Sequence, residues 1–380
     1  MEKYVSDFLK TAADNIRCII TGNFTEGVTD LNTLGNHALL RIDRKSVTPS
    51  VKNLPKLTAE QKKQIKKFYS PYVMFMTTRY HRLYTANYGE FHPEFFPEEF
   101  YAMYIDRYYS DREEARYLDN KCYYYRIFSN VHMPELIAMR IGTTWLNADQ
   151  EPITQQQASL LVKKEKEAVV KKAVNSEGGF GVSFVKGEEL YNTFTDTMNS
   201  IGCDVVIQKP VKQHSSFAAL HPDSVNTIRV VSLLRSDNVK IYAAALKIGT
   251  GGSRTDNGCQ GGIYCGLNSD GSLKNYGILD NGTLLYEHPD LHYKFSEKKL
   301  CHLDRVFELV KKAHPFMGHF RLISWDVTVD ENGDAVLIEA NLSLGGINDV
   351  QMCCGPLFGE DTKAILDEAL QGKRRFTTLI

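Results

Sequence analysis

From residue 119 onward, the chain consists largely of short runs of apolar and β-branched residues that follow one another closely. Runs of this length, bounded by glycine, asparagine and aspartate, predict strands. We expect strands at 138–145, 167–174, 181–185, 204–209, 227–235, 239–248, 321–329 and 335–340. Segments with helical character are at 152–166, 303–314 and 361–370. Helices alternating with mostly antiparallel strands indicate an α+β fold.

Residues 1–118 have a different character, because tyrosine, phenylalanine, lysine and glutamate are abundant in them. The stretch 58–69 begins with a helix-start signal at Thr58 and continues with good helix formers. The mixture of charged and apolar positions at 1–21 is typical of an amphipathic helix, not of a signal peptide. We therefore predict a mainly helical N-terminal region over 1–118.

The composition narrows the class of protein. The 380 residues are 43% hydrophobic and 24% charged, which suits a globular chain with more than one core. A formal net charge of −1 gives no global attraction to nucleic acid or to a membrane surface. Aromatic residues are dense at 69–125, but so are acids, which favours a packed helical region over a nucleic-acid reader.

Localisation and redox state follow from what the sequence lacks. No apolar run reaches the length of a spanning helix, so we expect a soluble, cytoplasmic protein without a membrane span. The eight cysteines form no C-x-x-C pair, and we expect them to be reduced and structural.

The last two predicted strands are joined by a turn that contains Asn332-Gly333, which predicts a β-hairpin. Asp326 lies on the first strand, while Glu339 and Asn341 lie two residues apart on the second and share a face. The apolar neighbours indicate a largely buried hairpin, and buried acids need a partner. These oxygen donors are suited to Mg²⁺. A solvent-facing hairpin with chance acids is the alternative.

Two loops are further candidates. In VVKKAVNSEGGFGV at 169–182, a β-run ends at Lys171 and Lys172 before a glycine loop whose N–H groups could bind a phosphate. It lacks the Walker and dinucleotide-binding spacings, and a plain hairpin turn explains it equally well. The polar loop 253–262 offers Arg254 and Asn257 for contact with substrate or phosphate, with a surface turn as the alternative.

These pieces, in this order, resemble the ATP-grasp superfamily, and specifically its sugar-transfer-associated branch, with D-alanine–D-alanine ligase a more distant relative. The resemblance covers roughly 75–370 and rests on YLDNK, VVKKAVNSEGGFGV, VVIQKPVKQH, HPDSVNTIRVVSLL, DNGCQGGIYCGLN and the WDVTVD…IEAN hairpin. It implies two α+β subdomains that clasp ATP, over 119–205 and 206–380, preceded by the mainly helical region 1–118.

The resemblance also implies a role for each matching position, with ATP and Mg²⁺ as cofactors. Lys121 should reach the phosphates, and Lys171 should bind the α- and β-phosphates, with Lys172 as its competitor. Gln208 should read the adenine amino group beside the backbone of Lys209 to Val211. The loop that closes over the phosphates should contain Ser176, Gly178, Gly179 and Gly181, and the metal ligands should be Asp326, Glu339 and Asn341.

The sequence departs from the family pattern at Ser324, where the D-alanine–D-alanine ligases have an arginine that helps to hold the transferred phosphate. Our candidate for the missing cation is Arg229 in the motif Asn226-Thr227-Ile228-Arg229, with Arg254 and Arg321 as weaker candidates. Arg229 is also our candidate for stabilising the oxyanion, together with Lys171 as a catalytic residue. The substrate-binding set implied by the motifs is Asn226, Arg229, Arg254 and Asn257.

The implied function is an ADP-forming carboxylate–amine ligase that works through an acyl phosphate. The branch implies a role in cell-surface polysaccharide biosynthesis, in which an amino acid or amino sugar is joined to a carboxylate such as a uronic acid. Two alternatives stay open. One is a phosphotransferase that stops after phosphoryl transfer, and the other is a nucleotide-binding pseudoenzyme that scaffolds glycosyltransferases.

Overall fold

The computed structural model describes residues 51–73, 76–174, 181–236 and 238–371. The amphipathic helix expected at 1–21 therefore lies outside the described residues. The chain divides into two compact units, one formed by Tyr109–Gly345 and the other by 1–108 together with 346–380. Residues 346–371 thus group with the N-terminal region. The predicted boundaries at residues 118 and 205 stay predictions.

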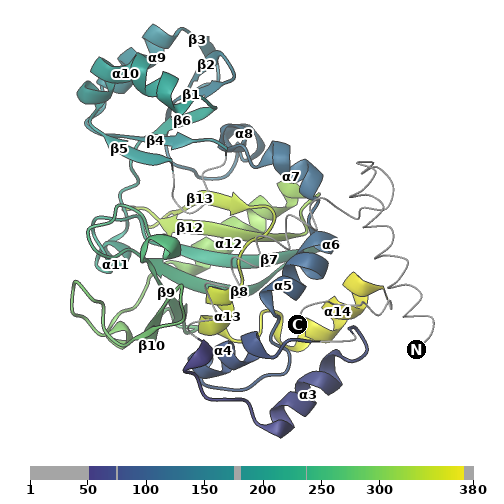
Figure 1. Ribbon diagram of the computed structural model, residues 1–380. Coiled ribbons are helices and arrows are strands. Elements are labelled where there is room, and N and C mark those ends of the chain that lie inside the picture. The colour runs from purple at the N-terminus through teal and green to yellow at the C-terminus, as the bar shows by residue number, and fades with distance from the viewer. Residues whose placement is uncertain (1–50, 74–75, 175–180, 237, 372–380) are drawn as a thin grey trace. The chain divides into compact units, whose positions relative to one another are not determined.

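The unit that contains the N-terminal region is helical in its described part, as predicted (Figure 1). The side chain of Thr58 accepts from the Gln61 backbone N–H and that of Gln61 accepts from Thr58, so a capping box starts α3. Tyr72 donates to Asp367 (2.8 Å) and joins the first helices to the last one. The helices are α3 (Ala59–Tyr69), α4 (Arg79–Tyr88), α5 (Glu98–Phe100), the π-helix η1 (Tyr101–Asp106), α13 (Asn348–Cys354), the 3₁₀-helix η6 (Gly359–Asp361) and α14 (Thr362–Leu370).

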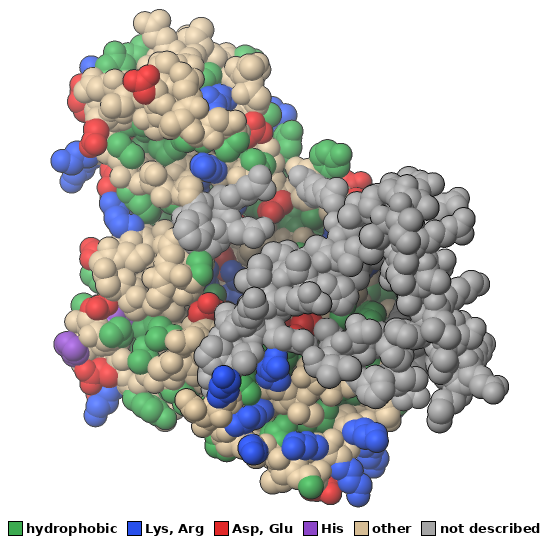
Figure 2. Space-filling view, in the orientation of Figure 1, with side chains coloured by type: hydrophobic (Ala, Val, Ile, Leu, Met, Phe, Trp, Pro, Cys, Tyr) green, Lys and Arg blue, Asp and Glu red, His purple; other side chains and the backbone are tan. Residues whose placement is uncertain are grey.

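Basic side chains gather on the surface of this unit around α3 and α4 (Figure 2). Lys62, Lys63, Lys66 and Lys67 occupy the exposed face of α3, while Ile65 and Tyr69 on the opposite face are buried. This division follows from the 3.6-residue period of the helix.

The other unit contains two antiparallel sheets. The first has the strand order β3-β2-β1-β6-β4-β5, and α9 (Gln155–Lys163) and α10 (Gly187–Ile201) cover one of its faces (Figure 1). Phe194 of α10 packs in this core with Trp145 of β2. The strands are β1 (Leu136–Ile141), β2 (Thr144–Asn147), β3 (Pro152–Ile153), β4 (Ala168–Lys172), β5 (Val182–Val185) and β6 (Val205–Gln208).

Two sequence predictions need correction in this sheet. The single strand expected at 138–145 is a hairpin, because Gly142 adopts a φ of 59° and turns the chain between β1 and β2. The helix α10 was not predicted. Its apolar residues Leu190, Phe194 and Met198 follow a helical spacing that could have identified it.

The second sheet has the order β11-β10-β9-β8-β7-β12-β13. Apolar residues of α12 (Leu303–Ala313), such as Val306 and Val310, join Ile228, Trp325 and Val327 in its core. The strands β9 to β11 were not predicted. The strands are β7 (Thr227–Arg235), β8 (Asn238–Ile248), β9 (Ile263–Leu267), β10 (Leu273–Leu279), β11 (Leu284–Leu285), β12 (Leu322–Val329) and β13 (Ala335–Asn341).

Three short helices complete this unit: α7 (Arg112–Leu118), α8 (Lys121–Ile127) and α11 (Ser215–Ala218). The three-residue helix α6 (Arg107–Tyr109) lies at the boundary between the two units. In the described part of the chain, every helix is too short or too polar to cross a membrane.

Candidate functional site

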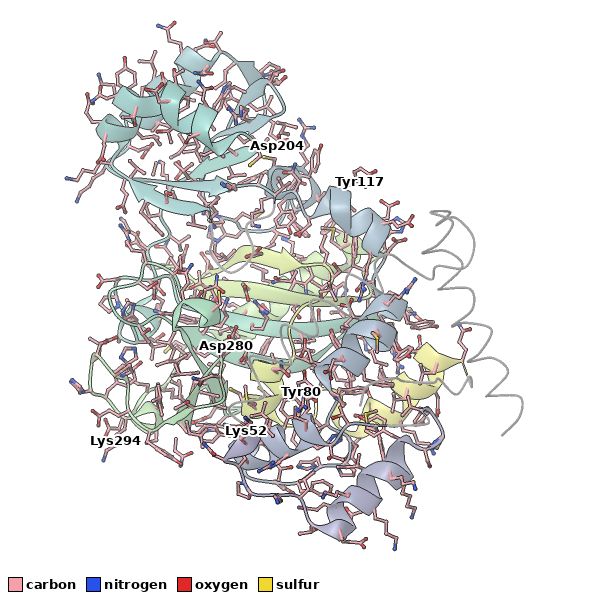
Figure 3. The ribbon with its side chains drawn as sticks, in the orientation of Figure 1. Lys52, Tyr80, Tyr117, Asp204, Asp280 and Lys294 are labelled. Carbon is pink, nitrogen blue, oxygen red and sulfur yellow. The ribbon has the colours of Figure 1, made fainter. Side chains whose placement is uncertain are left out.

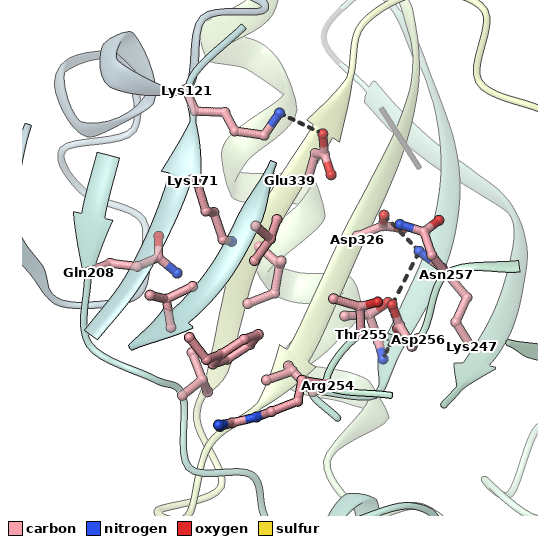
Figure 4. A pocket seen from close by; sticks show the side chains of 17 residues that line it. Lys121, Lys171, Gln208, Lys247, Arg254, Thr255, Asp256, Asn257, Asp326 and Glu339 are labelled. Carbon is pink, nitrogen blue, oxygen red and sulfur yellow. Dashed lines mark hydrogen bonds and ion pairs between the residues drawn. The ribbon is translucent and has the colours of Figure 1, made fainter. Parts of the chain in front are cut away.

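A cavity of about 750 Å³, including the solvent at its mouth, lies within the unit formed by Tyr109–Gly345. Strands of both sheets line it (Figure 4). The polar residues that line it are Lys121, Lys171, Gln208, Thr227, Lys247, Arg254, Thr255, Asp256, Asn257, Asp326 and Glu339.

The wall from the first sheet is set by the alternation of side chains along β4. Val169 and Lys171 line the cavity, whereas Lys172 packs its side chain beside Gly181. Burial lowers the pKa of the Lys171 ammonium from 10.5 to about 8, although the negative charge of Glu339 opposes this shift. Of the two lysines that the sequence left open, Lys171 therefore lies in the cavity.

The same wall carries apolar side chains, which we call the apolar slot. Val182 and Phe184 of β5 and Val211 line the cavity together with the side chain of Gln208, which is buried at the end of β6. An apolar lining with one amide is chemically suited to a heteroaromatic ring with an exocyclic amino group. Lys209, the predicted neighbour, does not line the cavity. Its ammonium pairs with Glu135 instead.

Lys121 reaches the cavity from the first turn of α8. The Asn120 side chain caps this helix by accepting from the Cys122 N–H (3.0 Å) and donates to Asp204 (2.6 Å), which Figure 3 labels. The Lys121 backbone N–H donates to Ala173 (3.0 Å) just after β4. Fixed in this way, the Lys121 ammonium lies 2.9 Å from Glu339 on the opposite wall.

The wall from the second sheet is built by strand register. Glu339 of β13 opposes Asp326 of β12, and Asp326 in turn opposes Arg229 of β7. A bulge between these strands inserts Ile338, so that Ile338 and Glu339 both line the cavity, whereas the sequence indicated simple alternation at these positions. Asp326 and Glu339 are thus brought together as predicted from the hairpin.

Two cations surround the Asp326 carboxylate. The Arg229 guanidinium binds it through Nε to Oδ1 (2.6 Å) and Nη2 to Oδ2 (3.0 Å), and the Lys247 ammonium lies 3.1 Å from Oδ2. Burial alone would raise the pKa of Asp326, but these charges hold it well below its usual range. Arg229 uses two guanidinium donors to bind this carboxylate, and it does not line the cavity.

Lys247 and Asp256 are functional candidates that the sequence analysis missed. Lys247 lies on β8 opposite Thr227, is 3% exposed, and also lies 3.6 Å from Asp256. Asp256 accepts from both the backbone N–H (2.8 Å) and the hydroxyl (2.5 Å) of Thr227. A lysine inside the apolar run AAALKI is the signal that could have identified this buried pair.

The polar loop at 253–262 contributes to the cavity, as its composition suggested. Arg254 forms a forked ion pair with Glu167 (2.6 and 2.9 Å), which immediately precedes β4, and its guanidinium lies 4.0 Å from the Phe184 ring centroid. Arg254 therefore connects this loop to the wall formed by the first sheet. Asn257 also lines the cavity.

Other predicted residues are not among those that line the cavity. Asn226 is fully buried, and its amide donates to Phe217 O and His221 O (3.1 and 2.8 Å), so it braces the chain before β7. Asn341 opposes Ser324 and donates to the Ser324 carbonyl (3.0 Å). The loop positions Ser176, Gly178 and Gly179 lie outside the described residues, whereas Gly181 is described and has a φ of 82°.

The donor set fits Mg²⁺. Across the described residues, no group of three or more His, Cys, Asp or Glu side chains is arranged to hold a metal. Mg²⁺ needs only one or two protein carboxylates when phosphates and water complete its octahedron. Asp326 and Glu339, at paired strand positions, are two carboxylates of this kind, and the Asn341 amide follows along the same strand face.

The cavity between the two antiparallel sheets thus has Lys121 and Lys171 on one wall and Asp326 and Glu339, with Lys247, on the other. Residues 99–365 match the family described as sugar-transfer associated ATP-grasp. Because this match spans more than half of the chain, the chain belongs to that family and has the ATP-grasp fold predicted from its motifs. No significant match is found among curated proteins.

Several solved structures are similar at low identity. The L-amino acid ligase of Bacillus licheniformis is 15% identical, covers 69% of this chain and 51% of its own, and has a TM-score of 0.39. The D-alanine–D-alanine ligase of Coxiella burnetii is 9% identical over 69% of this chain and 61% of its own, with a TM-score of 0.40.

The D-alanine–D-alanine ligase of Bacillus anthracis, solved with ATP, is 12% identical over 72% of this chain and 67% of its own, with a TM-score of 0.36. This chain spans less than two thirds of the length of the first two ligases. TM-scores this low support no conclusion about the present chain.

Proposed function

We propose that this protein is an ATP-dependent carboxylate–amine ligase that forms an acyl phosphate and releases ADP. One observation carries the proposal: Lys121 and Lys171 face Asp326 and Glu339 across one cavity, beside an apolar slot that ends at Gln208. Such a site can accommodate a triphosphate between cations and metal-binding acids, with an adenine ring in the slot.

Each group has a distinct task in this proposal. Lys171 and Lys121 bind the phosphates as charge-assisted donors, while Gln208 accepts from the adenine amino group. Asp326 and Glu339, together with the amide oxygen of Asn341, would hold Mg²⁺, which when bound neutralises phosphate charge. Arg229 fixes the orientation of Asp326 through its two hydrogen bonds, which is a positioning role rather than direct contact with substrate.

The chemistry balances in two steps. A carboxylate oxygen attacks the γ-phosphorus, the bond from that phosphorus to the β,γ-bridging oxygen breaks, and ADP leaves with the electron pair. The amine then attacks the acyl carbon, phosphate leaves, and the amine nitrogen loses one proton. The first step needs positioned cations more than it needs a general base, and the lysines of the cavity can supply that charge.

The family name associates the chain with sugar transfer, which narrows the proposed substrates. We propose that an amino acid or amino sugar is joined to a carboxylate such as a uronic acid, in the biosynthesis of a cell-surface polysaccharide. Arg254 and Asn257, which line the cavity from the polar loop, are the proposed contacts with this substrate.

The test is to incubate the protein with ATP, Mg²⁺ and pooled sugar acids and amino acids, and to analyse the products by mass spectrometry. A ligase produces ADP together with a product one water lighter than the sum of its two precursors. ADP with a stable phosphorylated product, and no condensation product, would show a phosphotransferase instead. Absence of both ADP and any product, in protein that binds ATP, would support a pseudoenzyme.

A further inference from the structure

Four cationic side chains among the described residues line the cavity, and three of them have a clear place in the proposed function. Lys121 and Lys171 lie on the wall of the first sheet and are the proposed phosphate ligands. Arg254, in the polar loop 253–262, is paired with Glu167. The fourth, Lys247, is the only one that the second sheet itself contributes to the described lining, and it lies beside the metal-binding acids.

Position 324 cannot provide a cation on that wall. Ser324 is 3% exposed, and a β-carbon at Gly345 would lie 2.6 Å from the Ser324 hydroxyl. Asn341, the residue opposite Ser324 on β13, also packs against this position, since its side-chain amide donates to the Ser324 carbonyl. A long side chain has no room here, so positive charge near Asp326 must come from neighbouring strands.

The neighbouring strands contribute two cations, Arg229 and Lys247, which differ in how they contact Asp326 and in whether they line the cavity. Arg229 uses two donors of its rigid fork on Asp326 and lies outside the cavity lining. Lys247 makes a single contact with Asp326 and lines the cavity, and it has a second carboxylate, Asp256, at 3.6 Å. A compact ammonium on a flexible stem can turn toward a new anion while it keeps Asp256 as its counter-ion.

We propose that Lys247 is a catalytic residue that contacts the terminal phosphoryl group of ATP, with Asp256 as the positioning residue that holds its charge in the buried site. This inference rests on the proposed ligase function. Lys247 keeps its proton throughout: the bond to the β,γ-bridging oxygen breaks, the bond to the carboxylate oxygen forms, and the ammonium stabilises the charge on the phosphoryl oxygens. Thr227 fixes Asp256 through its N–H and its hydroxyl.

A residue that touches only the terminal phosphate should distinguish ATP from ADP. The experiment measures by calorimetry the Kd of MgADP and of a non-hydrolysable Mg–ATP analogue. Lys247→Met alone leaves two buried acids with less compensating charge, so the double variant Lys247→Met/Asp256→Asn is made as well, with Asp256→Asn as its matched control. Lys171→Met is the comparison variant that should weaken binding of both nucleotides.

We expect the double variant to lose at least tenfold in affinity for the ATP analogue, relative to Asp256→Asn, while its affinity for ADP changes less than twofold. Equal losses for both nucleotides would assign Lys247 a structural role and overturn the inference, as would an unchanged preference for the ATP analogue. Wild-type protein that binds neither nucleotide would refute the proposed function itself, and the inference with it.

Discussion

Replacement of Lys171 by methionine should weaken ATP binding and also remove a specific pH dependence. Burial lowers the pKa of this ammonium to about 8, with the positive charge of Lys121 adding to the shift and Glu339 opposing it. Loss of a charged hydrogen bond costs about 1.5–3 kcal/mol, or roughly 10- to 150-fold in Kd. The methionine side chain keeps most of the length and apolar packing of the lysine stem.

The pH effect has a definite sign. In the free protein a group with a pKa near 8 is about 90% charged at pH 7 and about 10% charged at pH 9. A triphosphate would bind the charged form, so ATP binding should take up a proton above pH 8 and should weaken there. The wild-type Kd should therefore rise about tenfold between pH 7 and pH 9, which corresponds to about 1.4 kcal/mol.

Calorimetry at several pH values between 7 and 9.5, in two buffers of different ionisation enthalpy, measures both the Kd and the proton uptake. Lys171→Met should bind weakly with a flat pH profile, and Lys171→Arg should be flat but tighter, because arginine stays charged. Lys172→Met is the matched control, since Lys172 packs beside Gly181, and it should retain the wild-type slope. A wild-type slope that persists in Lys171→Met would refute the reasoning.

Three further predictions concern other parts of the site. Glu339→Gln should raise the Mg²⁺ concentration needed for ADP release at least tenfold, while thermal melts stay close to wild type; an unshifted Mg²⁺ requirement would remove Glu339 from the metal site. Arg254→Ala should raise the KM for the carboxylate substrate, Glu167→Ala should raise it by a smaller factor, and the double variant should match Arg254→Ala, because Glu167 acts on the substrate only by orienting Arg254; additive effects would exclude that coupling. Gly181→Ala should lower the free energy of unfolding by about 1–2 kcal/mol in urea titrations, because φ is 82°, with Gly318→Ala (φ −57°) as an unaffected control.

Local patterns predicted what depends on local structure. The helix at 58–69 has the capping signal at Thr58 and begins at Ala59, and the strand expected at 227–235 is β7 with the same bounds. The final hairpin was predicted because an Asn-Gly turn and alternating residues are confined to one short stretch. The family match confirms the ATP-grasp resemblance, which rested on the order of such stretches.

The parts that were missed depend on register between distant strands. Alternation along β4 shows that Lys171 and Lys172 face opposite ways, but only the pairing with β5 and β6 shows which one meets the cavity. The bulge at Ile338 could not be predicted, since it is a mismatch between two strands and has no signal in either one. The same applies to Lys247, which became a functional candidate only because the fold brings it to Asp326, 79 residues further along the chain.

The charged side chains around the cavity indicate how binding of Mg²⁺ and binding of ATP, its two proposed ligands, should influence each other. In the described residues, three carboxylates are paired with three cations: Asp256, Asp326 and Glu339 with Lys121, Arg229 and Lys247. Lys171 lines the same cavity and gives the cluster a net positive charge. Mg²⁺ alone would be repelled by that charge, and a triphosphate alone would bring more negative charge than the cluster balances. Together the two ligands carry less negative charge than the triphosphate alone, which the positive cluster can balance better. Binding should therefore be strongly coupled, with each ligand raising the affinity for the other by the same factor.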